Sequence, residues 1–359
     1  MEAIYGIPVI GILAQLVAYL IQTIPNIAPI ILGLATPIAL GALCGIMNER
    51  SGVVNIGIEG MMLTSAFVGF VAAGFSEPYL PTFELEIFNA TAPLLVGVVA
   101  AVLASMALSL LHAWLCITIR ADQIISGVII NIAALGLTGY LNRLLITPNP
   151  RVGAGTFASF NPPAELTGIP VIGWIFEMFL DQGPIAMSVI ICVIVLQVLL
   201  FRSRWGLRTR AVGEHPKAAD TVGIDVIGLR YRNVVIGGIF AGLAGAYLTL
   251  EATSSFQNNM TAGRGFIALA AVIFGRWTPL GALGAALLFF SAGAIGRAVS
   301  IRPPTDELAQ LGGILEAIPS EFYQSLPYVI TIIVLAGVVG RSIAPAAVGQ
   351  PYEKESKAA

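Results

Sequence analysis

Apolar runs of about 20 residues recur along this chain, and they limit the folds that it can adopt. A helix of that length crosses about 30 Å of hydrocarbon. Hydrophobic residues make up 57% of the sequence and charged residues only 11%, which is outside the range of ordinary soluble domains. We therefore expect a polytopic membrane protein with about ten segments, near residues 7–24, 27–46, 52–75, 92–119, 124–146, 184–201, 233–250, 265–274, 280–295 and 322–340.

The fold class expected from these runs is all-α. In lipid, backbone polar groups must be paired within a helix or a closed barrel, and the runs are too long and continuous for barrel strands. The run at 265–274 is too short for a regular span, so we expect a broken or re-entrant helix there. We expect residues 1–359 to form a single transmembrane domain whose first helix is retained, because no small-residue cleavage pattern ends that run.

Basic residues indicate the orientation in the membrane. The densest cluster lies at 202–232, and the positive-inside bias places that loop in the cytoplasm. Counting segments outward places both termini in the cytoplasm, including a tail at 342–359, and makes residues 147–183 an external loop. Four other arginines agree with this scheme (Arg50, Arg120, Arg276 and Arg341) and five oppose it (Arg143, Arg151, Arg264, Arg297 and Arg302).

One apolar segment carries both a carboxylate and an amide. Glu59 and Asn55 are four residues apart, so a helix would place them on one face. Polar and ionisable groups in lipid are costly unless a pathway or a partner uses them. Gly52, Gly57 and Gly60 would let the chain unwind or approach a neighbour closely. This face is expected either to line a translocation pathway or to form a polar clasp between helices.

Two further segments carry candidate pathway residues. Asn131 lies deep in the fifth segment, and Gln123 and Ser126 lie nearer its expected cytoplasmic end. Glu251 lies at the expected external end of the seventh segment. It precedes a loop that contains Phe256, Gln257, Asn258 and Arg264. These side chains are expected to form a gate or a docking surface, and the alternative is an ordinary polar loop.

The sequence offers little for catalysis. Its two histidines, His112 and His215, lie in an apolar run and in the basic loop, and no metal-ligand spacing is present. None of the lysines lies in a phosphate-binding glycine loop. We expect no catalytic site, no ATP hydrolysis by this chain alone, no cofactor and no metal. No acidic or basic tail indicates nucleic-acid binding.

The basic loop has a pattern of its own. Gly213 is expected in a turn, Pro216 suits an early helical position, and the residues after it suit one or two helical turns before Gly223. Its small and apolar side chains would fit a groove of another protein. The alternative is a solvated loop whose positive charge only fixes the topology.

Several stretches together resemble one family. They are GALCGIMNERSGVVNIGIEGMMLTSAF, GEHPKAADTVGI, IFAGLAGAYLTLE, NNMTAGRGFIALAAVIFGRWTPLGALGAALLF and the tail LPYVITIIVLAGVVGRSIAPAAVGQPYEK. The chain resembles the permease subunits of bacterial ATP-binding-cassette (ABC) importers for nucleosides and simple sugars. The likeness is greatest to the second of two permeases in nucleoside importers served by a basic-membrane-protein-type lipoprotein.

This resemblance implies a subunit that moves nucleosides across the cytoplasmic membrane of a prokaryote by alternating access. Its implied partners are a second homologous permease, an external substrate-binding lipoprotein and a cytoplasmic ATPase. The stretch Glu214–Ile224 matches the family's coupling loop. The resemblance therefore implies ATPase contacts by Glu214, Pro216, Lys217, Ala218, Ala219 and Gly223. The 147–183 segment is longer than expected for the family, which leaves the lipoprotein docking surface open.

Other functions remain compatible with the sequence. A related permease for ribose or another simple sugar is the main alternative. Branched-chain amino acids are a more distant choice of substrate, because their permeases share an asparagine-containing motif after a glycine. A proton-coupled secondary transporter would use Glu59 as its proton site. An intramembrane enzyme using His112 with Glu59 has no motif behind it.

Overall fold

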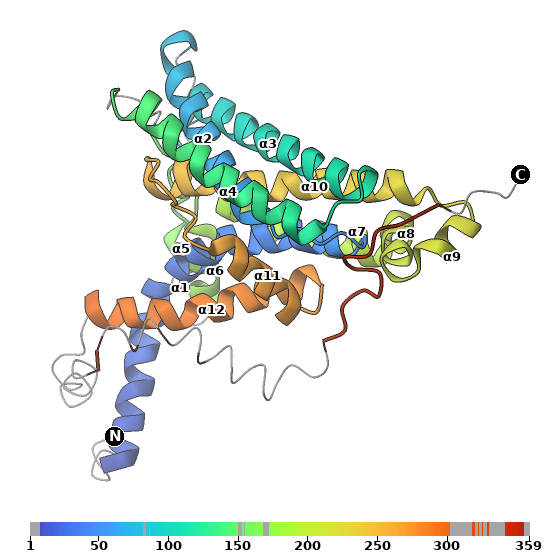
Figure 1. Ribbon diagram of the computed structural model, residues 1–359. Helices are drawn as coiled ribbons and strands as arrows, with labels where there is room; N and C mark the ends of the chain where they lie inside the picture. The colour runs from blue at the N-terminus through green and yellow to red at the C-terminus, as the bar shows by residue number, and fades with distance from the viewer. Residues whose placement is uncertain are drawn as a thin grey trace, which may run out of the picture. The chain divides into compact units, whose positions relative to one another are not determined.

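A computed structural model of the protein describes residues 8–81, 84–85, 87–149, 153, 155–167, 172–301, 318–319, 322, 325, 329 and 342–354. Helices make up most of this part of the chain (Figure 1). The chain divides into two compact units: unit 1 is Met1–Ala35, Phe160–Gln182 and Leu287–Gly340, and unit 2 is Thr36–Ser159, Gly183–Ala286 and Arg341–Ala359. Every candidate pathway and coupling residue lies in unit 2.

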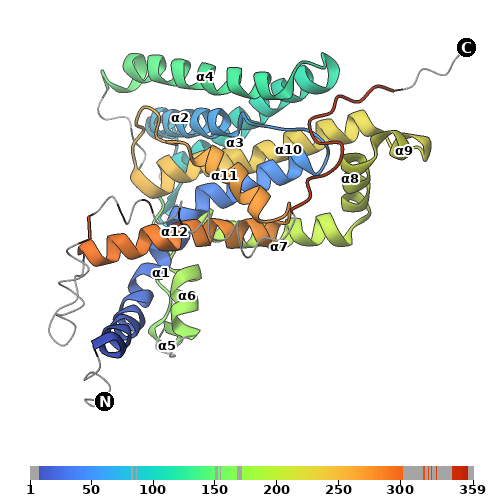
Figure 2. The same ribbon diagram turned by 60° about the horizontal axis from the view of Figure 1, so that its bottom comes forward.

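Unit 2 is built around helix α2 (Ile58–Ser76). This helix contacts α3 (Ala92–Ala113), α4 (Gln123–Leu141), α10 (Val226–Ala246) and α11 (Arg264–Phe274). Helices α3 and α10 also pack against each other, and α2, α3 and α10 run side by side in Figure 1 and Figure 2. Most residues of α2 are buried, as expected for a helix that is apolar on all sides.

The remaining elements belong to unit 2, to unit 1 or to both. Unit 2 also contains α7 (Pro184–Arg202), α8 (Arg204–Glu214), α9 (Pro216–Thr221), the 3-10 turn η2 (Glu77–Tyr79), the π-helical turns η3 (Trp114–Thr118), η4 (Asn142–Ile146) and η5 (Tyr247–Thr253), and the antiparallel strands β1 (Glu84–Leu85) and β2 (Ala90–Thr91). Helices α5 (Ala164–Thr167) and α6 (Ile172–Leu180) belong to unit 1, and α1 (Pro8–Glu49) and α12 (Pro279–Ile301) contribute to both units.

The expectation of an all-α polytopic membrane protein is confirmed. Among the described residues, six helices are long and apolar enough to cross a membrane: Ile27–Glu49, Ile58–Tyr79, Ala92–Thr118, Gln123–Ile146, Pro184–Arg202 and Val226–Thr253. Helix α11 has 11 residues, so the short segment expected at 265–274 is also present. The last expected segment, 322–340, lies almost wholly outside the described residues.

The separation of the first two expected segments is wrong. Residues 7–24 and 27–46 were expected as two helices, but α1 is one helix of 42 residues. Pro25 lies within this helix and does not end it. A proline removes one backbone donor, and helices in membranes tolerate this loss because neighbouring groups pair with the freed carbonyl. Composition alone does not distinguish such a proline from a helix end.

Gly245 allows α2 and α10 to approach each other closely. A Cβ added at Gly245 of α10 would lie 2.1 Å from Ser65 Oγ and 2.2 Å from the Met62 carbonyl oxygen of α2. The Ser65 hydroxyl also donates to the Ala241 carbonyl at 3.3 Å. Small residues at helix contacts are the usual means of close packing between membrane helices.

We predict that Gly245→Ala destabilises the folded protein by about 1–3 kcal/mol, because a backbone carbonyl cannot move aside as a flexible side chain can. Thermal unfolding in detergent measures this effect. Gly136→Ala is the matched control, because a Cβ at Gly136 of α4 would meet nothing within 4 Å. Equal melting temperatures for the two variants would contradict the close contact.

Candidate functional site

The polar residues expected in the membrane gather at a break between α1 and α2. Residues 50–57, called here the 50–57 loop, separate the two helices, and Val53–Asn55 have no regular secondary structure. Gly52 has φ +89°, a conformation that other residues rarely adopt. Irregular backbone at membrane depth is tolerated only where its polar groups are paired within the protein or line a cavity.

Side chains from α3 and α4 pair with the backbone of this loop. The Val54 amide donates to Gln123 Oε1 at 2.7 Å, and the Val54 carbonyl lies 2.9 Å from His112 Nε2. Because a carbonyl only accepts, Nε2 carries the proton. The other ring nitrogen of His112 lies 3.0 Å from Ser126 Oγ. His112, Gln123 and Ser126 are all buried, so these bonds replace water.

Two asparagines complete the pairing where α2 begins. Asn131 Nδ2 donates to the Ile56 carbonyl at 3.0 Å, and its Oδ1 accepts from the Gly60 amide at 2.7 Å. Asn55 Oδ1 accepts from the Gly57 amide at 3.0 Å. The first amides of a helix have no partner within it, so these side chains satisfy donors that lipid could not.

Glu59 connects α2 to α11. Its two carboxylate oxygens accept from the backbone amides of Gly263 and Gly265, at 2.8 and 2.6 Å. These amides lie at the start of α11, where the helix dipole favours a negative charge. The side chain of Glu59 is buried, and a Cβ at Gly265 would lie 2.6 Å from the Glu59 Cα atom.

Glu251 makes the same kind of contact with α7. Its carboxylate oxygens accept from the amides of Ile185 and Ala186, at 2.7 and 3.1 Å. Pro184, the first residue of α7, has no amide hydrogen to satisfy. The carboxylate therefore caps the beginning of a helix that is distant in sequence.

The structure thus brings Asn55, Glu59 and Asn131 together at the 50–57 loop and places Glu251 separately, beside α7. The observed contacts of Glu59, Asn131 and Glu251 join separate helices, as a polar clasp does, whereas Asn55 bonds to Gly57 and Met61 of its own segment. Their role in a translocation pathway stays a prediction. Sequence reasoning missed His112 as a partner of this loop, although a lone polar residue in an apolar run is itself a signal that a buried partner exists.

A second cluster joins the end of α1 to the turn that follows α11; of its residues, sequence reasoning used Arg50, for orientation. Trp277 Nε1 donates to a Glu49 carboxylate oxygen, and Arg50 Nε donates to the Trp277 carbonyl at 2.9 Å. The Arg50 guanidinium also lies 5.6 Å from the centre of the Phe201 ring.

The basic loop contains two short helices. The expected helical turns after Pro216 are confirmed as α9, with this proline at the first helical turn and Gly223 beyond its end at φ +84°. Ala219 is buried, whereas Lys217 and Ala218 are exposed. Val222, just after α9, is 75% exposed, which leaves an apolar side chain open to a partner.

The turn expected at Gly213 is wrong, because this residue lies inside α8. A Cβ there would lie 2.2 Å from the Arg50 carbonyl oxygen. Gly213 is therefore needed for the close approach of α8 to the 50–57 loop, and a glycine in sequence does not reveal which of the two roles it has.

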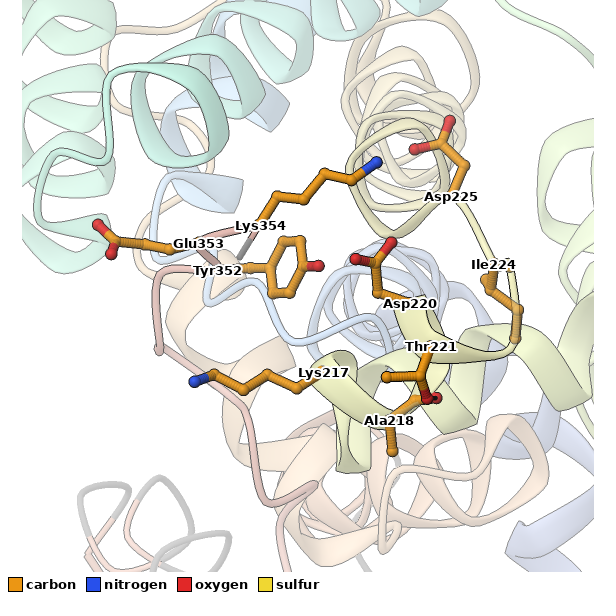
Figure 3. A pocket seen from close by; sticks show the side chains of 10 residues that line it. Lys217, Ala218, Asp220, Thr221, Ile224, Asp225, Tyr352, Glu353 and Lys354 are labelled. Carbon is orange, nitrogen blue, oxygen red and sulfur yellow. Dashed lines mark hydrogen bonds between the residues drawn. The ribbon is translucent and has the colours of Figure 1, made fainter. Parts of the chain in front are cut away.

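Helix α9 borders a groove of about 980 Å³. Figure 3 shows side chains from α9, from the turn that follows it and from the C-terminal tail around this groove. The lining residues are Lys217, Ala218, Asp220, Thr221, Gly223, Ile224, Asp225, Tyr352, Glu353 and Lys354. The tail residues had no assigned role in the sequence interpretation.

Comparison with known proteins identifies the family. Residues 27–335 match the family described as the permease component of branched-chain amino acid transport systems. The chain belongs to this family. The permease is therefore a multi-pass protein of the cell membrane, and it is the membrane component of an ABC transporter.

Three similar proteins cover nearly the whole permease. A guanosine ABC transporter permease, NupQ of Bacillus subtilis, is 40% identical over 93% of this chain and 98% of its own. A nucleoside ABC transporter permease, NupC of Lactococcus lactis, is 36% identical over 93% and 98%. A putative glucose ABC transporter permease, TsgC13 of Haloferax volcanii, is 34% identical over 89% and 95%.

We predict that Glu59→Gln destabilises the permease by about 1–3 kcal/mol. Glutamine keeps one acceptor oxygen but turns an NH2 group toward the second amide, which leaves a buried donor unpaired. Thermal unfolding of the purified protein measures the loss. Glu77→Gln is the control, because Glu77 is exposed. An unchanged melting temperature for Glu59→Gln would show that the two amide contacts contribute little.

Proposed function

We propose that this permease moves nucleosides into the cell as one subunit of an ABC importer. The supporting observation is its identity of 40% and 36%, over 93% of the chain, to permeases named for guanosine and for nucleosides. A simple sugar is the second candidate, because a relative named for glucose is 34% identical. The family description alone would favour branched-chain amino acids, but it carries less weight than these near full-length relatives.

We infer that the 50–57 loop and the start of α2 border the translocation route. The proposed route residues are Asn55, Glu59, Asn131 and Glu251, with Gly52, Gly57 and Gly60 permitting the break. Support comes from the irregular backbone there, since such backbone in membranes commonly lines a cavity. Glu59 would act by holding the start of α11 in place, because both of its oxygens are bonded to that helix.

We propose that α9 is the helix on which the ATPase acts. The proposed contact residues are Glu214, Pro216, Lys217, Ala218, Ala219 and Gly223. Support comes from the exposed Ala218 and Val222, and from the close approach of α8 to the 50–57 loop at Gly213. Closure of the ATPase would move α8 and α9, and the contact at Gly213 would carry this movement to the 50–57 loop.

The remaining parts of the proposal concern topology and partners. The loop at 202–232, the tail at 342–359 and both termini would face the cytoplasm, and residues 147–183 would be external. The permease would pair with a second homologous permease and receive substrate from an external lipoprotein. This chain would hydrolyse no ATP itself, and the permease pair would switch access between the two sides of the membrane.

Uptake of labelled substrates tests the function. Proteoliposomes would contain this permease, its partner permease, the ATPase and the lipoprotein. We predict ATP-dependent uptake of guanosine, adenosine or uridine that exceeds uptake of ribose and leucine by at least about tenfold. Uptake of ribose alone would assign a sugar importer. Proton-driven uptake by this chain without the ATPase would overturn the ABC mechanism.

A charge on α9 tests the coupling role. We predict that Ala218→Glu lowers nucleoside uptake about tenfold or more by weakening ATPase binding, since a buried unpaired carboxylate at an interface costs several kcal/mol. Co-purification of the ATPase with the permease pair measures binding. Asn161→Glu, an exposed site in the 147–183 segment, is the control. Full ATPase binding by Ala218→Glu would remove α9 from the interface.

A further inference from the structure

The described part of the C-terminal tail, residues 342–354, is bound to the same region of the protein as α9. The Ala347 amide donates to the Gly213 carbonyl at 2.9 Å, and the Gly349 amide donates to the Gly52 carbonyl at 3.2 Å. The Ala346 amide donates to a Glu214 carboxylate oxygen at 3.1 Å. The tail, dark red in Figure 2, thus contacts both the end of α8 and the 50–57 loop.

Tyr352 anchors the tail against α8, α9 and α10. It is 7% exposed and packs in an apolar cluster with Val212 of α8, Ala219 of α9 and Val226 of α10. Figure 3 shows its side chain pointing toward Asp220 of α9. The buried side of α9, at Ala219, therefore packs against Tyr352 of the tail.

Charged side chains contact the tail on either side of Tyr352. Arg230 of α10 is buried, and its Nη1 donates to the Gln350 carbonyl at 3.0 Å. Arg120, after α3, forms an ion pair with Glu353 at 2.6 Å. The second contact joins the tail to the corner between α3 and α4, so the tail links helices that are far apart in the sequence.

The tail and α9 form one continuous surface. They share the groove of about 980 Å³, which has charged side chains of both signs: Lys217, Asp220 and Asp225 from the α9 region, and Glu353 and Lys354 from the tail. Lys217, Ala218 and Thr221 lie both on the exposed face of α9 and along this groove. A partner protein that covers this face and the neighbouring Val222 would therefore also reach the groove.

We propose that residues 346–354 form, together with α9, a composite docking surface for the ATPase subunit, and that Tyr352 is the residue that positions α9 in it. This inference rests on the proposed function, in which α9 receives the ATPase. The partner surface would carry both acidic and basic groups opposite the groove, and an apolar contact opposite Val222. Movement of the docked ATPase would reach the 50–57 loop directly through Gly349 and Gly52.

Hydrogen exchange tests the composite surface without any substitution. Amide exchange is compared between the permease pair alone and the complete complex. We expect exchange to slow about tenfold or more both in α9 and in residues 346–354 when the ATPase is bound. Protection of α9 without the tail would overturn this inference and leave the proposed coupling intact. Protection of neither would overturn the coupling role of α9 as well.

Tyr352→Ala tests the positioning role. We expect about tenfold weaker ATPase association and a similar loss of substrate-stimulated ATP hydrolysis. Tyr79→Ala, at a residue that is 86% exposed, is the control. Normal association and hydrolysis by a Tyr352→Ala complex that melts at the wild-type temperature would overturn the role. Guanosine uptake by the unaltered complex, measured in parallel, tests the proposed function separately.

Discussion

The structure of unit 2 depends on pairing the free backbone amides at the starts of its membrane helices. Water is not present in the bilayer to satisfy them, and each unpaired amide would cost several kcal/mol. Glu59 supplies acceptors for α11 and Glu251 supplies them for α7. Asn131 does so for α2 while also pairing with a carbonyl of the 50–57 loop. Polar side chains, whose burial in lipid costs free energy, thus make short and interrupted helices possible by pairing with their backbone amides.

The 50–57 loop joins this polar region to the surface where α8, α9 and the tail meet. Val54, in the middle of the loop, is held by His112 and Gln123, whereas Arg50 and Gly52, at its start, contact Gly213 and Gly349. A movement of α8 would therefore act on a segment whose far end continues into α2. Chains of packed and hydrogen-bonded contacts of this kind can carry energetic coupling between two sites.

Much of this arrangement was accessible from the sequence, but not all of it. Apolar length predicted the all-α membrane fold, and the cost of burying Glu59 and Asn55 predicted that each serves either a pathway or a partner. The turn expected at Gly213 and the helix end expected at Pro25 were both wrong. Glycine occurs both in turns and at close helix contacts, and proline occurs both at helix ends and inside membrane helices, so the residue type alone does not decide. The tail carried no pattern that indicated its contacts, since its binding depends on backbone amides and a single buried tyrosine.

The sequence by itself determined that the protein lies in a membrane, that its fold is all-α and which buried polar residues need a pathway or a partner. Hydropathy and desolvation are local properties of each segment. Only the tertiary structure decided which partner each residue has. Glu59 accepts from amides about 200 positions away, and Tyr352 packs against α8 and α9 across more than a third of the chain. Pairings at such distances depend on how helices pack together, and no local pattern records that packing.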